Sequence, residues 1–337
     1  MDRSFNGFVR PDGRVGVRNK VAVIYTVDCA RFVSDKIAKS IPNGISVGWY
    51  SCYSTEDMND VNTLVGIGAN PNVGAAIVIG LGCQSIAPSE IAARISKIGK
   101  CVEVLSIQGA GGTNKTIEKG VQIAKRMSND LFKLKRTRNE LSKLSIGVKF
   151  DGSGSAFRAS WGLIQTVCDE IANFGGKILL GQSAGISAKQ GYEKYPLSNL
   201  GLGINPPRSG WYSVDGLVAR SERHFGLESD GEPTDLAAAG AQIILRGVES
   251  GLVGGNVISP LIKVCADSSA CGKMGDDLDF GSVSKMYRKS EEWRRLLDLV
   301  IDVASGKQTK SELLGHTEGS VILGGRPLLT IPEQICE

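Results

Sequence analysis

The sequence predicts an α/β fold of two Rossmann-like lobes with mostly parallel sheets. From Val21 onward, short β-branched runs alternate with stretches whose apolar residues have helical spacing. Strands alternating with helices are typical of right-handed βαβ units and of a parallel sheet covered on both faces. The chain has 337 residues, about twice the usual domain size of roughly 100–200 residues, so two packed domains are expected.

In the first lobe, expected over residues 1–140, each short strand is followed by a turn that carries glycine or cysteine and then by a helix. The expected strands are 21–27, 45–51, 75–82 and 102–108. The expected helices are 31–41, 56–67, 89–98 and 113–135.

A charged stretch at 136–143 separates this series from a second one and predicts the C-terminal lobe over residues 141–337. Strands are expected at 145–150, 177–182, 243–248 and 257–266, and helices at 157–174, from Thr234 and at 290–304. Residues 183–220 are rich in Gly, Pro, Ser and Tyr and predict a long loop, which is either a lid or an irregular connection.

Charge and hydropathy exclude several classes of protein. The formal net charge of +4 is small, and the one local basic cluster, Lys133 to Arg138, is interpreted as the solvated end of a helix, so no nucleic-acid partner is expected. The N-terminus carries no apolar signal segment, and the longest apolar run, Val73 to Cys83, is far short of the ~20 residues that span a bilayer. We therefore expect a cytoplasmic protein without a membrane partner. The eight cysteines form no CxxC pair, and reduced thiols are expected.

Cysteines gather where ligands bind in an open parallel sheet, outside the carboxyl ends of the strands. The expected strands end at Asp28-Cys29, Ser51-Cys52, Cys83-Gln84 and Gln108-Gly109, so three of the four end at a cysteine. Neighbouring strands lie ~4.8 Å apart, which brings such thiols within reach of one metal ion or iron–sulfur cluster if the strands are adjacent. The alternative is that each thiol is a small buried hydrophobe.

A glycine-rich turn follows the fourth expected strand. Gly111, Gly112 and Thr113 open a helix there, and their backbone N–H groups are suited to a carboxylate or phosphate. The alternative is a tight turn capped by Thr113. Dinucleotide binding is disfavoured, because Gly80 to Ser85 lacks the third glycine of the GxGxxG pattern.

Other chemistry is limited by the residues available. The chain has two histidines, His224 and His316, which nearly excludes schemes that need a histidine pair or triad. The acidic run Asp276 to Asp279 is suited either to a hard cation or to a solvated helix end.

Seven segments resemble, in the same order, the successive signatures of the altronate/galactarate dehydratase family, and together they extend over nearly the whole chain. They are GFVRPDGRVGVRN (7–19), NPNVGAAIVIGLGC (70–83), SIQGAGGTNKTIEKG (106–120), AAAGAQIIL (237–245), PLIKV (260–264), KMGDDLDF (273–280) and SGKQTKSELLGH (305–316). The family consists of hydro-lyases that require iron or another divalent metal, with a relative that eliminates sulfite from sulfolactate. The resemblance implies a dehydratase large subunit that converts a sugar acid such as altronate or galactarate into a 2-keto-3-deoxy acid.

Such a reaction needs a Lewis acid, a carboxylate anchor and a group that moves a proton. We assign candidate roles by residue type and position. The metal or iron–sulfur ligands are Cys29, Cys52 and Cys83; the substrate-binding residues are Arg14, Arg18, Asn19, Gly111, Gly112 and Thr113; and the catalytic residues are Asp151, Lys263 and Gln108.

The chain departs from the family pattern at three places. The pattern has a histidine where this chain has Lys20, His-x-His-Gly-Cys where it has Gly48 to Cys52, and Cys-Gly-Gly-Ser-Asp where it has Phe150 to Gly154. An alternative is therefore a catalytically silent paralogue that serves as a binding or regulatory subunit, or a sulfo-lyase. Only six residues precede the first motif, where family members carry a small β-rich domain, so we expect an oligomer with a separate small subunit of about 100 residues.

Overall fold

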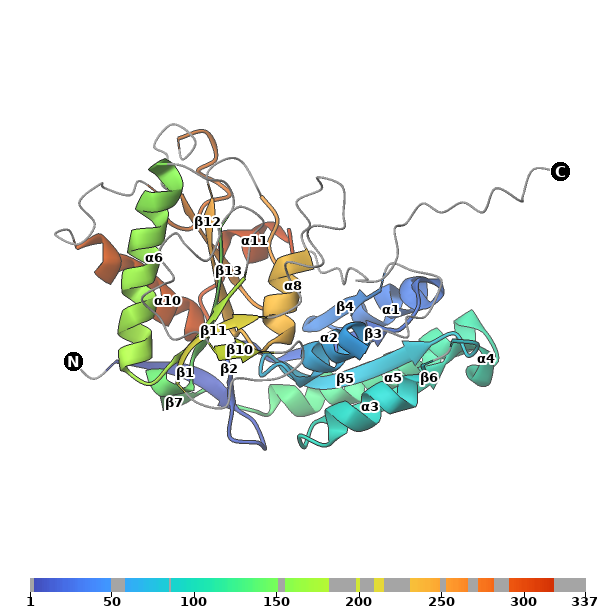
Figure 1. Cartoon of the computed structure of the whole chain (residues 1–337). Coiled ribbons are helices and arrows are strands. Elements are labelled where there is room, and N and C mark those ends of the chain that lie inside the picture. Colours follow the sequence, from blue (N-terminus) through green and yellow to red (C-terminus); the bar gives the residue numbers. More distant parts are fainter. Residues whose placement is uncertain are drawn as a thin grey trace.

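The computed structural model consists of two parallel sheets with helices on their faces and a small antiparallel sheet beside them (Figure 1). The described residues are 3–49, 58–84, 86–150, 155–181, 198–200, 209–214, 231–248, 253–265, 272–281 and 291–317. Within these ranges, no helix is both long and apolar enough to cross a membrane.

The first lobe is built on a four-stranded parallel sheet in the order β4-β3-β5-β6. Its strands are β3 (Lys20–Tyr25), β4 (Gly44–Gly48), β5 (Val73–Gly80) and β6 (Cys101–Ser106). Its main helices are α1 (Arg31–Ala38), α2 (Met58–Ala69), α3 (Pro88–Ser96) and α5 (Thr113–Phe132). These elements confirm the predicted series.

Side chains alternate between the two faces of this sheet. Val21 and Val23 of β3 pack in one apolar cluster with α1 and α5, whereas Ala22 and Ile24 pack in another with α2 and α3. Because both faces are covered by helices, the central strands β5 and β3 are apolar after their first residues, which explains their continuous apolar runs.

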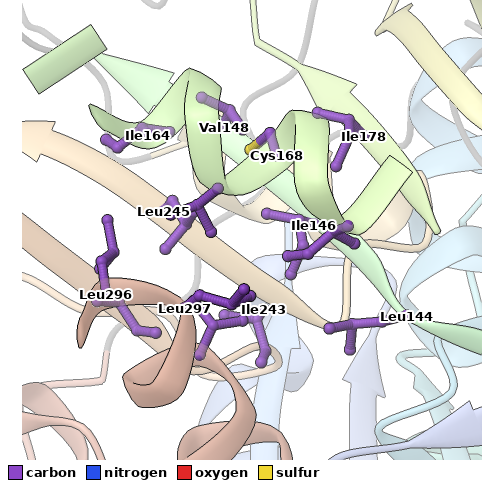
Figure 2. Packing of buried hydrophobic residues seen from close by; sticks show 14 of the residues in the cluster. Leu144, Ile146, Val148, Ile164, Cys168, Ile178, Ile243, Leu245, Leu296 and Leu297 are labelled. Atoms are coloured by element: carbon purple, nitrogen blue, oxygen red, sulfur yellow. The ribbon is translucent and has the colours of Figure 1, made fainter. Parts of the chain in front are cut away.

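The second lobe has a six-stranded parallel sheet in the order β10-β11-β9-β8-β12-β13. Its strands are β8 (Ser145–Phe150), β9 (Lys177–Leu180), β10 (Ser198–Leu200), β11 (Gly210–Val214), β12 (Ile243–Val248) and β13 (Leu261–Cys265). Its helices are α6 (Ser155–Asn173), α8 (Gly231–Ala238) and α10 (Glu292–Ala304). Figure 2 shows Ile146 and Leu245 of this sheet between Cys168 of α6 and Leu297 of α10. Both lobes therefore confirm the predicted α/β class with mostly parallel sheets.

The long loop predicted over residues 183–220 is wrong at two places, because strands β10 and β11 lie inside it. Each pairs in parallel with its neighbour, and Trp211 and Tyr212 are buried. Glycines and prolines around these short strands hid them, since β10 has only three residues and β11 five.

The N-terminal segment forms a small antiparallel sheet that the sequence did not predict. It contains β1 (Ser4–Val9), β2 (Val15–Gly16) and β7 (Thr137–Glu140), in the order β2-β1-β7. Phe5, Val15 and Val17 are buried in the apolar cluster of the second lobe. Residues 4–17 therefore pack with the C-terminal lobe, although the sequence assigned them to the N-terminal one.

Part of the predicted basic helix end is structural. α5 ends at Phe132, and the Arg136 guanidinium donates hydrogen bonds to the carbonyls of Asn6 (2.7 Å), Val17 (2.9 Å) and Ala304 (3.2 Å). Lys133, Lys135 and Arg138 show the expected solvated pattern, and Lys133 forms an exposed ion pair with Asp130. The expectation of reduced thiols also needs one correction, since Cys265 is disulfide-bonded, whereas Cys29, Cys83, Cys101 and Cys168 are free.

The two lobes meet at a buried turn between α2 and β5. The Asn70 side-chain amide donates to the carbonyls of Ala237 (2.7 Å) and Ala241 (2.9 Å), at the end of α8. The Asn72 side chain accepts from the backbone N–H of Val17 (2.9 Å) and of Arg18 (3.2 Å) and donates to the carbonyl of Gln242 (2.8 Å). Both asparagines are fully buried, so these hydrogen bonds join three parts of the chain without water.

A second link joins the first and last family-like segments. The Arg18 guanidinium forms a two-bond fork with the Glu312 carboxylate (2.8 and 2.7 Å) and also donates to the carbonyls of Val303 (3.0 Å) and Lys307 (2.8 Å). Glu312 also closes the capping box of helix α11 (Lys310–Leu314) with Thr309. Burial alone would raise the pKa of Glu312, but the hydrogen bonds and charge of Arg18 lower it.

The asparagine turn yields a stability prediction. Asn72→Ala should lower the free energy of unfolding by about 3 kcal/mol or more, because each buried polar group left unsatisfied costs ~1–3 kcal/mol. Urea denaturation measures the loss. Asn129→Ala, at an exposed position of α5, is the matched control and should change little. A loss below about 1 kcal/mol for Asn72→Ala would show that the turn is not a main link between the lobes.

The Arg18–Glu312 pair yields a pH-dependent prediction. Arg18→Met should cost ~3–5 kcal/mol at neutral pH, since it leaves a buried carboxylate unpaired. The pKa of Glu312 is lowered in the folded state, so the pair stabilises above the ordinary value of 4.5 and its contribution is lost as pH falls through the folded pKa. The cost of the substitution should therefore shrink in acid. Arg126→Met, which breaks the exposed 2.6 Å pair with Glu103, should cost ~1 kcal/mol or less. Equal losses for both variants in urea titrations would contradict this.

Candidate functional site

The first sheet has a topological switch point between β3 and β5. The chain leaves β3 toward β4 on one side and leaves β5 toward β6 on the other, and a ligand crevice is expected at the carboxyl ends of two such strands. In the strand register, Tyr25 of β3 lies opposite both Gly48 of β4 and Ile79 of β5. The crevice is the place where the sequence predicted ligand chemistry.

The three predicted metal-ligand cysteines follow adjacent strands by the same offset. Cys29 lies four residues after Tyr25, Cys52 four after Gly48 and Cys83 four after Ile79. The adjacency that the thiol cluster requires is thus present in the sheet. Cys29 and Cys83 are exposed free thiols, whereas Cys52 lies outside the described residues. Exposure excludes the alternative that these two are buried hydrophobes.

A set of polar contacts holds the loops after β3 and β5 together. The Gln84 amide accepts from the backbone N–H of Gly82 (2.8 Å) and donates to the Thr26 hydroxyl (3.3 Å), which in turn donates to the carbonyl of Ile79 (3.2 Å). Gln84 therefore bridges the loop that carries Cys83 to the strand end that precedes Cys29.

Asp28 is a feature of this edge that the sequence assignment passed over. It opens a 3-10 turn (Asp28–Ala30) that leads into α1, and its Oδ1 atom is buried without a hydrogen-bond donor among the described residues. A buried carboxylate oxygen is normally paired with a donor or a cation. In the sequence, the feature that points to Asp28 as a site residue is its position beside Cys29 at the end of a strand. Thr26 and Gln84 also lie at strand ends, so the same feature points to them.

Gln108 lies at the same edge. Its backbone N–H donates to the carbonyl of Leu81 (3.0 Å), and its side chain is so close to Gly82 that a Cβ atom there would lie 2.5 Å from the Gln108 Oε1 atom. Helix α4 (Ile107–Ala110) begins here, and Figure 1 places it at the end of the first lobe farthest from β12.

The glycine-rich turn leaves the start of α5 open. Gly111 and Gly112 have φ values of 87° and 105°, and no side chain caps the helix, which begins at Thr113. A Cβ atom on Gly112 would meet nothing within 4 Å. The predicted cap by Thr113 is therefore wrong, and the first N–H groups of a 20-residue helix remain available to an anion.

The predicted carboxylate-binding residues lie elsewhere, at the amino ends of the strands. Arg18 is occupied by Glu312 and backbone carbonyls, and Asn19 accepts from Arg10 (2.8 Å) and donates to the carbonyl of Leu131 (2.7 Å). Arg14 binds Asp12 and the carbonyl of Ala69 (2.8 Å). β3 separates these residues from Cys29 by roughly 20 Å, which is longer than a six-carbon sugar acid. These contacts give all three side chains structural partners at the end of the sheet away from the cysteines.

Lys263 belongs to the buried interior of the second lobe. Its backbone N–H donates to the Asp279 carboxylate (2.9 Å), and its ammonium donates to the carbonyl of Val253. Burial lowers the pKa of Lys263 and raises that of Asp279. Asp279 also accepts from the backbone N–H of Lys310 (2.8 Å), so this part of the acidic run is neither a cation site nor a solvated helix end.

Two further residues named from the sequence lie outside the described part of the chain. Asp151 follows β8 directly but lies outside the described residues, as does His224. The described part of the chain, which does not include Cys52, holds no group of three or more His, Cys, Asp or Glu side chains arranged for a metal.

Lys20, where the family pattern has histidine, lies at the start of β3. Its ammonium donates to the carbonyl of Val257 (2.6 Å). Burial lowers its pKa to about 8, with Glu312 opposing and Arg18 reinforcing the shift. This lysine therefore joins the lobes on the side of the sheet away from the cysteines.

Comparison with known proteins identifies two family regions. Residues 7–131 match the family model described as "D-galactarate dehydratase/Altronate hydrolase, second domain", and residues 214–325 match "D-galactarate/Altronate dehydratase, C-terminal".

Curated relatives agree, at low identity. The chain is 24% identical to (2R)-sulfolactate sulfo-lyase subunit beta of Chromohalobacter salexigens, over 94% of this chain and 96% of the relative. It is 23% identical to altronate dehydratase of Escherichia coli, over 96% of this chain and 78% of the relative. It is 26% identical to altronate dehydratase of Bacillus subtilis over 45% of this chain and 33% of the relative. With both family regions and this fold in one chain, the protein belongs to the altronate/galactarate dehydratase family, whose named members are lyases.

Proposed function

We propose that this chain is the large subunit of a hydro-lyase that removes water from a sugar acid such as altronate or galactarate to give a 2-keto-3-deoxy acid. The observation that carries the proposal is the shared four-residue offset of Cys29, Cys52 and Cys83 beside the switch point of the first sheet. Family membership supports the class of reaction, and the positions of the strand ends support the location of the proposed active site.

The residues at this edge fit an iron ion, another divalent metal or an iron–sulfur cluster. Thiolates of Cys29, Cys52 and Cys83 would hold it, and the unpaired Oδ1 atom of Asp28 is suited to a cation beside them. When bound, such a metal supplies a Lewis acid for the substrate hydroxyl or carboxylate.

The protein groups at the edge divide the remaining work. The open start of α5 at Gly112 is suited to the end of the substrate away from the reacting carbons, such as the second carboxylate of galactarate, through backbone N–H groups and the helix dipole. Asp28 would accept the proton from the carbon next to the reacting carboxylate, at the cysteine end of the substrate, and Gln108 would orient a hydroxyl group. Loss of the β-hydroxyl as water then leaves an enol, which relaxes to the 2-keto acid.

These roles fit the spacing of the strands. β3 and β6 are separated by β5 alone, so their carboxyl ends lie two strand spacings, roughly 10 Å, apart. Asp28 follows β3 and Gly112 follows β6, so one extended sugar acid can reach from the proton-accepting group to the helix N-terminus. Asp151 and Lys263 remain alternative proton-moving groups on the second lobe.

We place a small companion subunit of about 100 residues at the same edge. One relative is named as a subunit beta, and the thiols of Cys29 and Cys83 are exposed here. Strand β1 lies at the opposite end of the molecule from α4 (Figure 1), so the proposed docking surface is the cysteine edge rather than the N-terminal strand. Such a subunit would supply the histidines that this chain lacks.

Two other functions have specific support. Lys20 in place of the family histidine favours a catalytically silent binding or regulatory subunit. The match over 94% of the chain to a sulfolactate sulfo-lyase subunit favours elimination of sulfite in place of water.

The metal proposal predicts a selective loss on substitution. Protein purified without oxygen should contain iron or another divalent metal, and Cys29→Ser and Cys83→Ser should each reduce it at least about tenfold, because a thiolate ligand is removed. Cys101→Ser is the matched control, since Cys101 is an exposed free thiol at the amino end of β6. Elemental analysis together with the absorption spectrum measures the outcome. Metal content equal in all four proteins would refute the shared site.

The reaction proposal predicts a 2-keto product. Metal-loaded protein should convert altronate, galactarate or a related sugar acid into a product that 2-keto-acid reagents detect, and release of sulfite from sulfolactate would identify the sulfo-lyase alternative. The assay compares the chain alone with the complex purified from its native host, and Asp28→Asn should lower kcat by about 100-fold or more. Absence of turnover in both preparations with metal present would favour the silent paralogue.

A further inference from the structure

A basic pocket lies between the lobes at the amino ends of the strands. Arg14 and Pro71 line it from the first lobe and its entering segment, and Lys143, Ser145 and Lys177 line it from the second. Lys177 begins β9 and Ser145 begins β8, while Pro71 precedes β5. Eight residues of β5 separate this pocket from the cysteine edge by roughly 25 Å, so it is a different site.

The charges in the pocket are of one sign. No carboxylate lines it, and neither Lys143 nor Lys177 makes an ion pair with a described carboxylate. Asp12 lies outside the pocket lining and pairs with Arg14, at 2.6 Å. Three cationic side chains thus share a small volume with one countercharge beside it.

Arg14 is held in place with a donor left over. Its Nε atom donates to Asp12 (2.7 Å) and its Nη2 atom to the carbonyl of Ala69 (2.8 Å). Its Nη1 atom is buried and has no acceptor among the described residues. A buried cationic donor without an acceptor is costly, and an anion is the partner that removes this cost.

The surroundings strengthen the positive field. Lys100 and Arg10 lie close enough to interact electrostatically with Arg14, and both are fixed on backbone carbonyls of the turn that contains Pro71. Burial lowers the pKa of Lys177, and the charges of Arg14 and Lys143 lower it further. The folded chain therefore holds like charges together at a cost that a bound anion would offset.

We propose that this pocket binds a small oxyanion, the phosphate group or carboxylate of a small metabolite, held by Arg14, Lys143 and Lys177 across the lobe junction. Planar guanidinium and flexible ammonium donors suit either oxyanion. Because the ligand would contact both lobes, it would stabilise their closed arrangement and act as an effector rather than as the substrate.

The test is binding of inorganic phosphate, sulfate and malonate to the full chain at constant ionic strength, with chloride as the reference anion. Thermal unfolding should show a rise in Tm, and titration calorimetry should show saturable binding, for at least one of these anions. A response to phosphate and sulfate identifies a phosphate-type ligand, and a response to malonate identifies a carboxylate. Lys143→Gln with Lys177→Gln should weaken binding at least about tenfold, since two charged donors are lost.

Two control variants test whether a loss of binding comes from the pocket itself. Lys119→Gln with Lys125→Gln removes the same charge from exposed positions of α5 and should bind as the wild type does. Lys143→Arg with Lys177→Arg keeps the charge and should retain binding even if the glutamine variant folds poorly. The proposal is overturned if none of the three anions shifts Tm beyond chloride, or if the glutamine variant in the pocket binds as tightly as the one on α5.

Discussion

The structure depends on one buried turn, in which the side chains of Asn70 and Asn72 form hydrogen bonds with backbone N–H and C=O groups of three segments that are distant in sequence. Asn72 reaches the N-terminal segment and the start of β12, and Asn70 reaches the end of α8. An apolar side chain could fill the same volume but would leave buried N–H and C=O groups unpaired. Polar complementarity therefore helps to set how the two lobes meet, beside the apolar contacts of Ala237, Ala238 and Ile258 with the first lobe.

This constraint explains why the motif arginines bind carbonyl groups at the junction of the lobes. Arg10, Arg14 and Arg18 lie beside the same turn, and their guanidinium groups donate to the carbonyls of Pro71, Ala69 and Lys307. Cations suit these carbonyls because α2 ends at Ala69, where the helix dipole is negative. A family-like motif rich in arginine thus serves the junction of the lobes, and the residues that we propose for the chemistry lie at the other end of the strands.

The two ends of the first sheet therefore have separate tasks. The amino ends carry buried cations and the joint with the second lobe, whereas the carboxyl ends carry Cys29 and Cys83, the unpaired Asp28 carboxylate and the open start of α5. The separation protects the reactive edge from the packing demands of the joint. It also leaves that edge exposed, where a second subunit can complete it.

Sequence by itself determined the class of fold, most strands and helices, and the three equivalent cysteine positions, because β-branched runs and strand-end residues are local signals. It could not decide which charged residues become structural, since an arginine that binds Glu312 across 294 positions of sequence looks the same as one that binds a substrate. Tertiary structure alone decided the roles of Arg18 and Asn19, the strands hidden in 183–220 and the placement of residues 4–17 with the second lobe. Each of these depends on partners far along the chain, and only folding brings them together.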